Sequence, residues 1–109
     1  MEEFTLDELI EMCPSGAEIW EEVEALGRML LEKNIKYGDS ALSPINIFSG
    51  LSAKDRIAVR KDDKLARIRE QMLMDHSDDE DPEWGLAGYI LLDRVRRKQE
   101  RALRQQVAQ

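Results

Sequence analysis

The sequence predicts an all-α fold, a bundle of about four helices, on three observations. Apolar residues recur at intervals of three and four along the long periodic stretches, which is the spacing of one helix face. Pairs of residues typical of helix starts precede these stretches. No segment of useful length shows the apolar–polar alternation of a half-buried strand.

The first two predicted helices flank a break at residues 13–16. Thr5 and Glu8 form a capping box that begins a short first helix. Ser15 and Glu18 form a second capping box, which begins a long second helix that ends near Asn34. Its apolar stripe consists of Ile19, Val23, Leu26 and Leu30. A stripe this broad needs cover from other helices or from another subunit.

Residues 37–51 form the least helical stretch, because glycine, proline and asparagine punctuate it. Ile45, Ile47 and Phe48 give this stretch apolar side chains to bury. We therefore expect a long, ordered loop between the second and third helices.

The third helix is predicted to begin around Ser52, with Asp55 as its capping partner, and to reach about residue 74. Its apolar sector consists of Ile57, Leu65, Ile68 and Met72. Lys61 falls on this apolar face. Either the helix restarts near Lys61, or the lysine stem lies along the apolar surface and its amine reaches water.

The fourth helix has the clearest start. Asp81 suits the N-cap, Pro82 suits the first helical position, and Glu83 favours the positive end of the helix dipole. The apolar residues that follow are Trp84, Ala87, Ile90, Leu91 and Val95. A basic helical tail, residues 94–109, completes the chain.

The length of 109 residues predicts a single helical domain spanning 1–109. One cysteine, Cys13, permits no internal disulfide, which favours a reducing compartment. The N-terminus is acidic where a signal peptide would be basic. The longest uncharged apolar run is far shorter than the roughly 20 residues of a membrane helix. We therefore expect a cytoplasmic protein that does not associate with membranes.

The net charge of −7 is unevenly distributed. Every ionised side chain in residues 1–26 is acidic, whereas the tail carries Arg94, Arg96, Arg97, Lys98, Arg101 and Arg104. DNA binding is not expected of so acidic a protein, because phosphate neutralisation supplies most of that affinity. The tail could instead meet an anionic partner or the acidic end of a sister subunit. The broad apolar stripes predict a homodimer or a larger homo-oligomer.

Acidic residues form the first candidate site. Glu18, Glu21 and Glu22 share one helix face, and Glu80 and Asp81 could approach them to complete an oxygen-rich Mg²⁺ site. A bound Mg²⁺ would neutralise phosphate charge and orient a water. The alternative is a solvated acidic face of an amphipathic helix.

Cations form the second candidate site. Arg60, Lys64 and Arg67 lie on one face of the third helix, and their residue types suit phosphate. Asp63 lies among them and could simply pair with Arg67 to stabilise the helix.

The turn after the second helix is the third candidate. Gly38 allows a ligand to approach the backbone, Tyr37 could stack on a base, and Asp39 could bind a sugar hydroxyl, with Lys33 nearby. The alternative is an ordinary helix C-cap. Nucleophilic catalysis and a zinc site within one chain are not expected, because Cys13 and His76 are the only residues of their kinds.

Several of these stretches together resemble one family. They are residues 33–38, 46–48, 60–68, 80–81 and 86–89. Their order and spacing over about 18–95 resemble the nucleotide modification associated domain (type 1) family, known chiefly from bacteriophages. The strongest element is Asp63, Lys64 and Arg67, with Arg60 just upstream.

This resemblance implies a role in phage nucleotide or DNA-base modification, in the host cytoplasm if the chain is phage-encoded. The arrangement is also similar, more distantly, to the all-α nucleoside triphosphate pyrophosphohydrolases, which are oligomeric and hold Mg²⁺ on paired acidic motifs. Glu18 and Glu21 match the first pair. The family pattern places an aspartate where this chain has Gly85, so either Glu83 or Asp81 substitutes, or nucleotide binds without hydrolysis.

We therefore expect a protein that binds a nucleotide or deoxynucleotide phosphate with Mg²⁺. If it is an enzyme, nucleoside triphosphate pyrophosphohydrolysis is the expected reaction. The alternative is a non-catalytic small phage protein that binds and inhibits a host protein.

Overall fold

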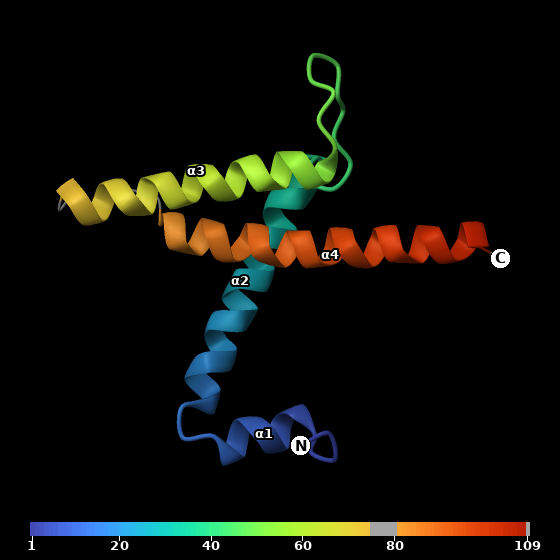
Figure 1. Cartoon of the computed structure of the whole chain (residues 1–109). Helices are drawn as coiled ribbons and strands as arrows, with labels where there is room; N and C mark the ends of the chain where they lie inside the picture. Colours follow the sequence, from blue (N-terminus) through green and yellow to red (C-terminus); the bar gives the residue numbers. More distant parts are fainter. Residues whose placement is uncertain (75–80, 109) are drawn as a thin grey trace. The chain divides into compact units, whose positions relative to one another are not determined.

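A computed structural model describes residues 1–74 and 81–108, which contain four α-helices and no strand. The helices are α1 (Leu6–Met12), α2 (Gly16–Lys36), α3 (Ala53–Met74) and α4 (Pro82–Ala108) (Figure 1). The predicted all-α fold with about four helices is confirmed. Contacts along the chain divide it into two compact units, Met1–Lys33 and Asn34–Gln109.

The start of α1 follows the sequence signal. Thr5 caps α1, since its Oγ1 accepts from the Glu8 backbone N–H at 3.2 Å, while a Glu8 carboxylate oxygen accepts from the Thr5 N–H at 3.4 Å. The predicted capping box is confirmed. Gly16 begins α2 where a Cβ would collide with the backbone of Ile10, so only glycine fits this turn.

The same signals begin both helices of the second unit. Ser52 Oγ accepts from the Asp55 N–H at 3.2 Å at the start of α3. Asp81 Oδ1 accepts from the N–H groups of Glu83 and Trp84, and Pro82 is the first residue of α4. α3 is continuous through Lys61, so the helix does not restart there.

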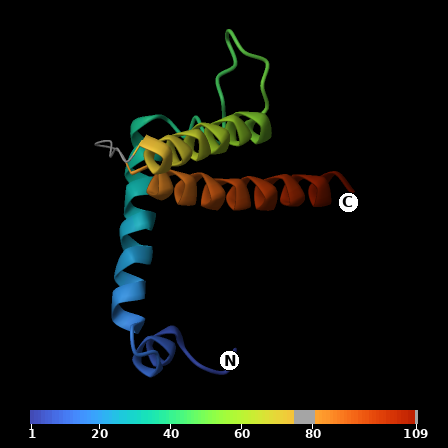
Figure 2. The ribbon, with the colours of Figure 1, turned by 60° about the vertical axis from the view of Figure 1, so that its left-hand side comes forward.

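α3 and α4 pack against each other as an antiparallel helical hairpin (Figures 1 and 2). Among the described residues the buried apolar side chains are Ile57 of α3, 1 % exposed, and Leu92 of α4, 7 % exposed. The apolar part of this core is therefore small.

The buried face of α4 includes charged residues. Ile90, Leu91 and Val95 are exposed, whereas Gly88, Leu92, Asp93 and Arg96 are buried. On α3 the predicted sector is buried only at Ile57, is half-buried at Ile68, and is exposed at Leu65 and Met72. The physical reason is that charged side chains occupy the hairpin interface beside the apolar ones.

The loop between α2 and α3, residues 37–52, also differs from expectation. Arg56 of α3 donates a hydrogen bond to the Asn46 side chain at 3.3 Å, which ties the loop to the hairpin. Its apolar residues nevertheless remain uncovered. Ile45 and Ile47 are exposed, and the Phe48 ring is as exposed as in an extended peptide.

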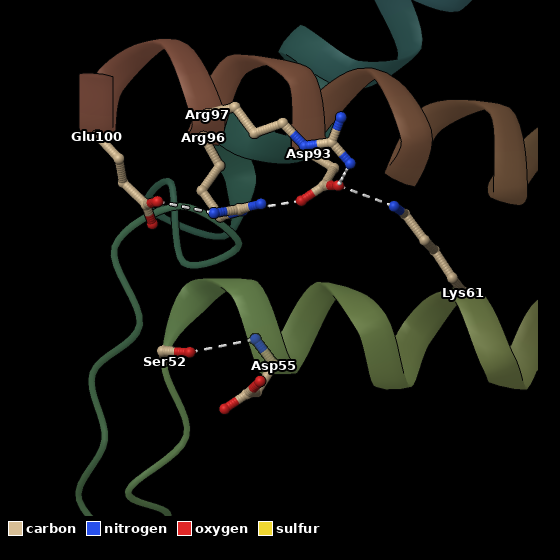
Figure 3. A network of polar contacts seen from close by, with 7 residues as sticks. All are labelled: Ser52, Asp55, Lys61, Asp93, Arg96, Arg97 and Glu100. Atoms are coloured by element: carbon tan, nitrogen blue, oxygen red, sulfur yellow. Dashed lines mark hydrogen bonds and ion pairs between the residues drawn. The ribbon is translucent and has the colours of Figure 1, made fainter. Parts of the chain in front are cut away.

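A buried carboxylate joins the two helices of the hairpin. Asp93 of α4 accepts from Lys61 Nζ of α3 at 3.0 Å, from Arg96 Nε at 2.8 Å and from an Arg97 guanidinium nitrogen at 2.8 Å (Figure 3). Arg96 donates its other contact to Glu100, at 2.8 Å. The amine of Lys61 therefore binds a buried carboxylate. This ion pair explains why a lysine lies on the inner face of α3.

The charge state of Asp93 reflects these partners. Burial acts to raise the pKa of Asp93, but hydrogen bonds from Arg96 and Lys61 and their positive charges outweigh it and lower the pKa from 3.8 to about 2. The hydrogen bond to Asp93 in turn raises the pKa of Arg96. Asp93 is thus an anion at every pH at which the protein is expected to function.

Arg96 and Arg97 bond Asp93 at the same distance, 2.8 Å. We therefore expect their burial to decide how much each contributes to the stability of the fold. The Arg96 side chain is 8 % exposed and that of Arg97 is 59 % exposed. We expect Arg96→Ala to lower the free energy of unfolding by about 2–4 kcal/mol, and Arg97→Ala by less than about 1 kcal/mol. Urea unfolding measures both losses. Equal losses would contradict the importance of the buried bond.

Acid should remove the contribution of Asp93. Because its folded pKa lies below the unfolded value, its stabilisation is complete above about pH 4 and is lost as the pH falls towards 2. We expect the stability difference between the wild type and Asp93→Asn to shrink over this window. The measurement is the free energy of unfolding of both proteins between pH 6 and pH 2. A difference that stays constant with pH would show that Asp93 is not the titrating group.

Candidate functional site

Four residues singled out in the sequence line one surface depression in the second unit. Arg60, Asp63, Lys64 and Arg67 are at i, i+3, i+4 and i+7 of α3, so helix geometry alone places them on one face. The depression has a volume of about 300 Å³. It is lined by Arg60, Asp63, Lys64, Ala66, Arg67 and Tyr89. The structure therefore brings the predicted cations together around a hollow.

α4 contributes Tyr89, which the sequence analysis did not assign to the site. Tyr89 is half-buried and comes from the helix that packs against α3. Its role could not be found from periodicity, because it depends on how the two helices are paired. The resemblance to a family did include residues 86–89, which was the available signal.

Gly85 lies one helical turn before Tyr89 and makes room for Lys64. A Cβ at position 85 would come within 2.8 Å of Lys64 Cε and 3.3 Å of its Nζ. The lysine stem therefore lies directly against the α4 backbone. Packing against Lys64 thus explains a glycine at position 85. The family resemblance predicts an aspartate at the same position.

The lining of the depression carries three positive charges and one negative charge. Arg60 and Asp63 form a long ion pair, 3.9 Å between nitrogen and oxygen, and both side chains are exposed. An exposed pair of this kind contributes about 0–1 kcal/mol. An anion with stronger acceptors could therefore replace it at little cost. The cationic depression stands out in a chain whose net charge is −7.

The turn after α2 has the geometry of a helix terminus. The Asp39 N–H donates to the Asn34 carbonyl at 2.8 Å, and the Gly38 N–H donates to that of Ile35 at 3.4 Å. Gly38 has φ +62° and Asp39 has φ +59°. These features form a Schellman C-cap. Tyr37 and Asp39 are exposed and are not among the residues that line the depression.

Lys33, the remaining residue predicted for nucleotide binding, is exposed on α2 in the first unit. Lys36 places its ammonium 5.6 Å from the centre of the Tyr37 ring. A ligand role for Lys33, Tyr37 or Asp39 stays a prediction.

The predicted magnesium ligands are divided between the two units and the residues outside the description. Glu18, Glu21 and Glu22 are exposed on α2, Asp81 caps α4, and Glu80 lies outside the described residues. Residues 1–74 and 81–108 contain no group of three or more His, Cys, Asp or Glu side chains that could hold a metal ion. The Mg²⁺ site stays a prediction, and no reaction step is derived from it.

No protein-family model, no curated protein and no solved structure matches this chain. None of the described helices is both long and apolar enough to cross a membrane. The chemistry of the depression is therefore interpreted from its own residues.

Replacing Gly85 should alter the depression without weakening α4. Gly85→Ala improves helix propensity by up to about 1 kcal/mol, but its Cβ must displace Lys64. We expect an unchanged or higher Tm and a roughly three- to tenfold weaker affinity for pyrophosphate, measured by calorimetry.

Gly27→Ala is the matched control, because a Cβ there meets nothing within 4 Å. It should raise stability and leave pyrophosphate affinity unchanged. Equal affinities of all three proteins for pyrophosphate would contradict a role for the position of Lys64.

Proposed function

We propose that the depression between α3 and α4 binds the phosphate groups of a nucleotide or deoxynucleotide. The observation that carries this proposal is the convergence of Arg60, Lys64 and Arg67 with Tyr89 on one hollow. The phage-type nucleotide-modification role implied by the family resemblance agrees with it.

The cations supply the phosphate-binding part of the proposal. Arginine presents a planar fork that matches two phosphate oxygens, and lysine adds a mobile point charge. Arg60 and Arg67 are two helical turns apart, with Lys64 between them, so the three can engage a chain of more than one phosphate. A diphosphate or triphosphate uses this row better than a single phosphate.

Tyr89 is the reason to propose a nucleotide and not merely an inorganic anion. Its ring lines the same hollow and offers an aromatic surface on which a base can stack. A volume of about 300 Å³ is at the lower end of small-molecule sites, so part of the ligand would remain in solvent. Asp63 is positioned as an acceptor for a sugar hydroxyl or a base amine.

Hydrolysis is a separate proposal. Pyrophosphohydrolysis follows from the resemblance and needs Mg²⁺, whereas phosphate binding needs only the cations. Nucleotide binding without turnover therefore agrees with the glycine at position 85. Binding and turnover measured with and without Mg²⁺ distinguish phosphate binding from hydrolysis.

A thermal-shift screen of nucleoside mono- and triphosphates tests binding. A ligand at a hundred times its Kd stabilises by about 2.7 kcal/mol, which raises Tm by about 10 °C in a domain of this size. We expect such a shift for at least one nucleotide, and its loss in the variant Arg60→Ala, Lys64→Ala, Arg67→Ala.

The control variant removes three cations that do not line the depression, Lys54→Ala, Arg69→Ala and Arg94→Ala. It changes the net charge equally and should keep the shift. Loss of the shift in both variants would mean that total charge, and not this site, governs binding.

A second candidate function is binding to another protein without chemistry. The fully exposed Phe48, beside exposed Ile45 and Ile47 in the loop of residues 37–52, favours it, because exposed apolar clusters mark protein contacts. The absence of a shift with every nucleotide would favour this candidate over the first.

A further inference from the structure

The end of α4 extends beyond the helix that covers its inner face. Lys61 meets Asp93, and the two helices are antiparallel. Ala53, the first residue of α3, precedes Lys61 by eight residues, so it lies near Arg101, eight residues after Asp93. Residues 102–108, the α4 overhang, therefore continue past α3, as both ribbon views show (Figures 1 and 2).

The inner face of α4 stays apolar along this overhang. Leu103 and Val107 follow Leu92 and Arg96 at helical spacing, so all four share one face. Leu92 and Arg96 are buried against α3, whereas Leu103 is 61 % exposed and Val107 is 88 % exposed. The buried stripe therefore runs on into a segment that α3 does not cover.

Basic side chains surround the exposed part of this stripe. Arg101 and Arg104 are exposed on the same two turns. Residues 94–108 contain six basic side chains and one acidic one, Glu100, which is bonded to Arg96. An occupant of this surface needs apolar side chains bordered by negative charge.

The first half of α2 has that complementary character. Ile19 and Val23, four residues apart like Leu103 and Val107, are exposed. Glu18 and Glu22 border them and are exposed too. Residues 1–26 contain nine acidic side chains and no basic one.

We propose that the chain forms a dimer in which the Ile19–Val23 face of α2 from one copy packs on the α4 overhang of a second copy. Each copy carries one surface of each kind, and a two-fold axis between two copies would pair both, which is the closed arrangement that we propose. Each of these apolar faces is uncovered within its own unit, and the charges that border the two faces are opposite, which is why we choose a second copy as the occupant.

The inference goes beyond nucleotide binding and does not rest on it. None of its residues lines the depression. Opposite charges border the two apolar faces, so the dimer Kd should rise as the salt concentration rises.

Two charge-reversal variants test the dimer. Glu18→Lys with Glu22→Lys changes only α2, and Arg101→Glu with Arg104→Glu changes only the overhang, leaving the Asp93 contacts intact. In either variant alone, like charges face each other. We expect sedimentation equilibrium to show a wild-type dimer and a dimer Kd weakened at least about 100-fold in each variant.

An equimolar mixture of the two variants should recover a dimer, since each contact then joins opposite charges again. Recovery in the mixture requires contact between two chains. If the acidic face instead meets the basic end of its own chain, the wild type is a monomer and the mixture of variants forms no dimer, which would overturn the proposal.

The variant Leu103→Ser with Val107→Ser tests the apolar part of the same interface, because it keeps every charge. It should also be monomeric, and its far-UV circular dichroism should remain helical. A wild-type monomer at low salt, or dimeric single variants, would refute the interface. Binding of the wild-type monomer to single-stranded RNA through Arg101 and Arg104 would assign the overhang to nucleic acid instead.

Discussion

The carboxylate of Asp93 is the interaction on which the second unit depends. It is buried between α3 and α4 and satisfied by Lys61 from one helix and by Arg96 and Arg97 from the other. A buried charge must find its partners, so the hairpin has one favourable register and any slip leaves an unpaired ion. The apolar core is too small to impose that register, since Ile57 and Leu92 are its buried apolar side chains.

The candidate site inherits its geometry from this register. Lys61 is the neighbour of Arg60 in sequence, and Lys64 is one turn further along the same helix. Fixing Lys61 on Asp93 therefore sets where the cations of α3 stand relative to Gly85 and Tyr89 of α4. An ion pair on one side of α3 thus sets the position of the cationic depression on an adjoining side.

The sequence was informative where local rules decide the outcome. Capping at Thr5, Ser52 and Asp81 placed the helix starts, because one side chain bonding a nearby backbone N–H needs no tertiary context. The row of cations on α3 could also be predicted, because the geometry of a single helix places these residues on one face. The inner face of α4 could not be predicted from the sequence, because apolar periodicity identifies a buried face only when the core is apolar. In α4, Asp93 and Arg96 are buried, whereas Ile90 and Val95 are exposed. Lys61 on an apolar face was the available sign of a buried acidic partner.

Gly85 also sets what the depression can accept. An aspartate at position 85 would place a carboxylate beside the Lys64 side chain, because a Cβ there already comes within 3.3 Å of Lys64 Nζ. That carboxylate would be an internal anion at high effective concentration, and it would compete for the lysine with any other anion. A glycine at position 85 thus keeps a carboxylate out of the depression, whose lining would otherwise carry one more negative charge.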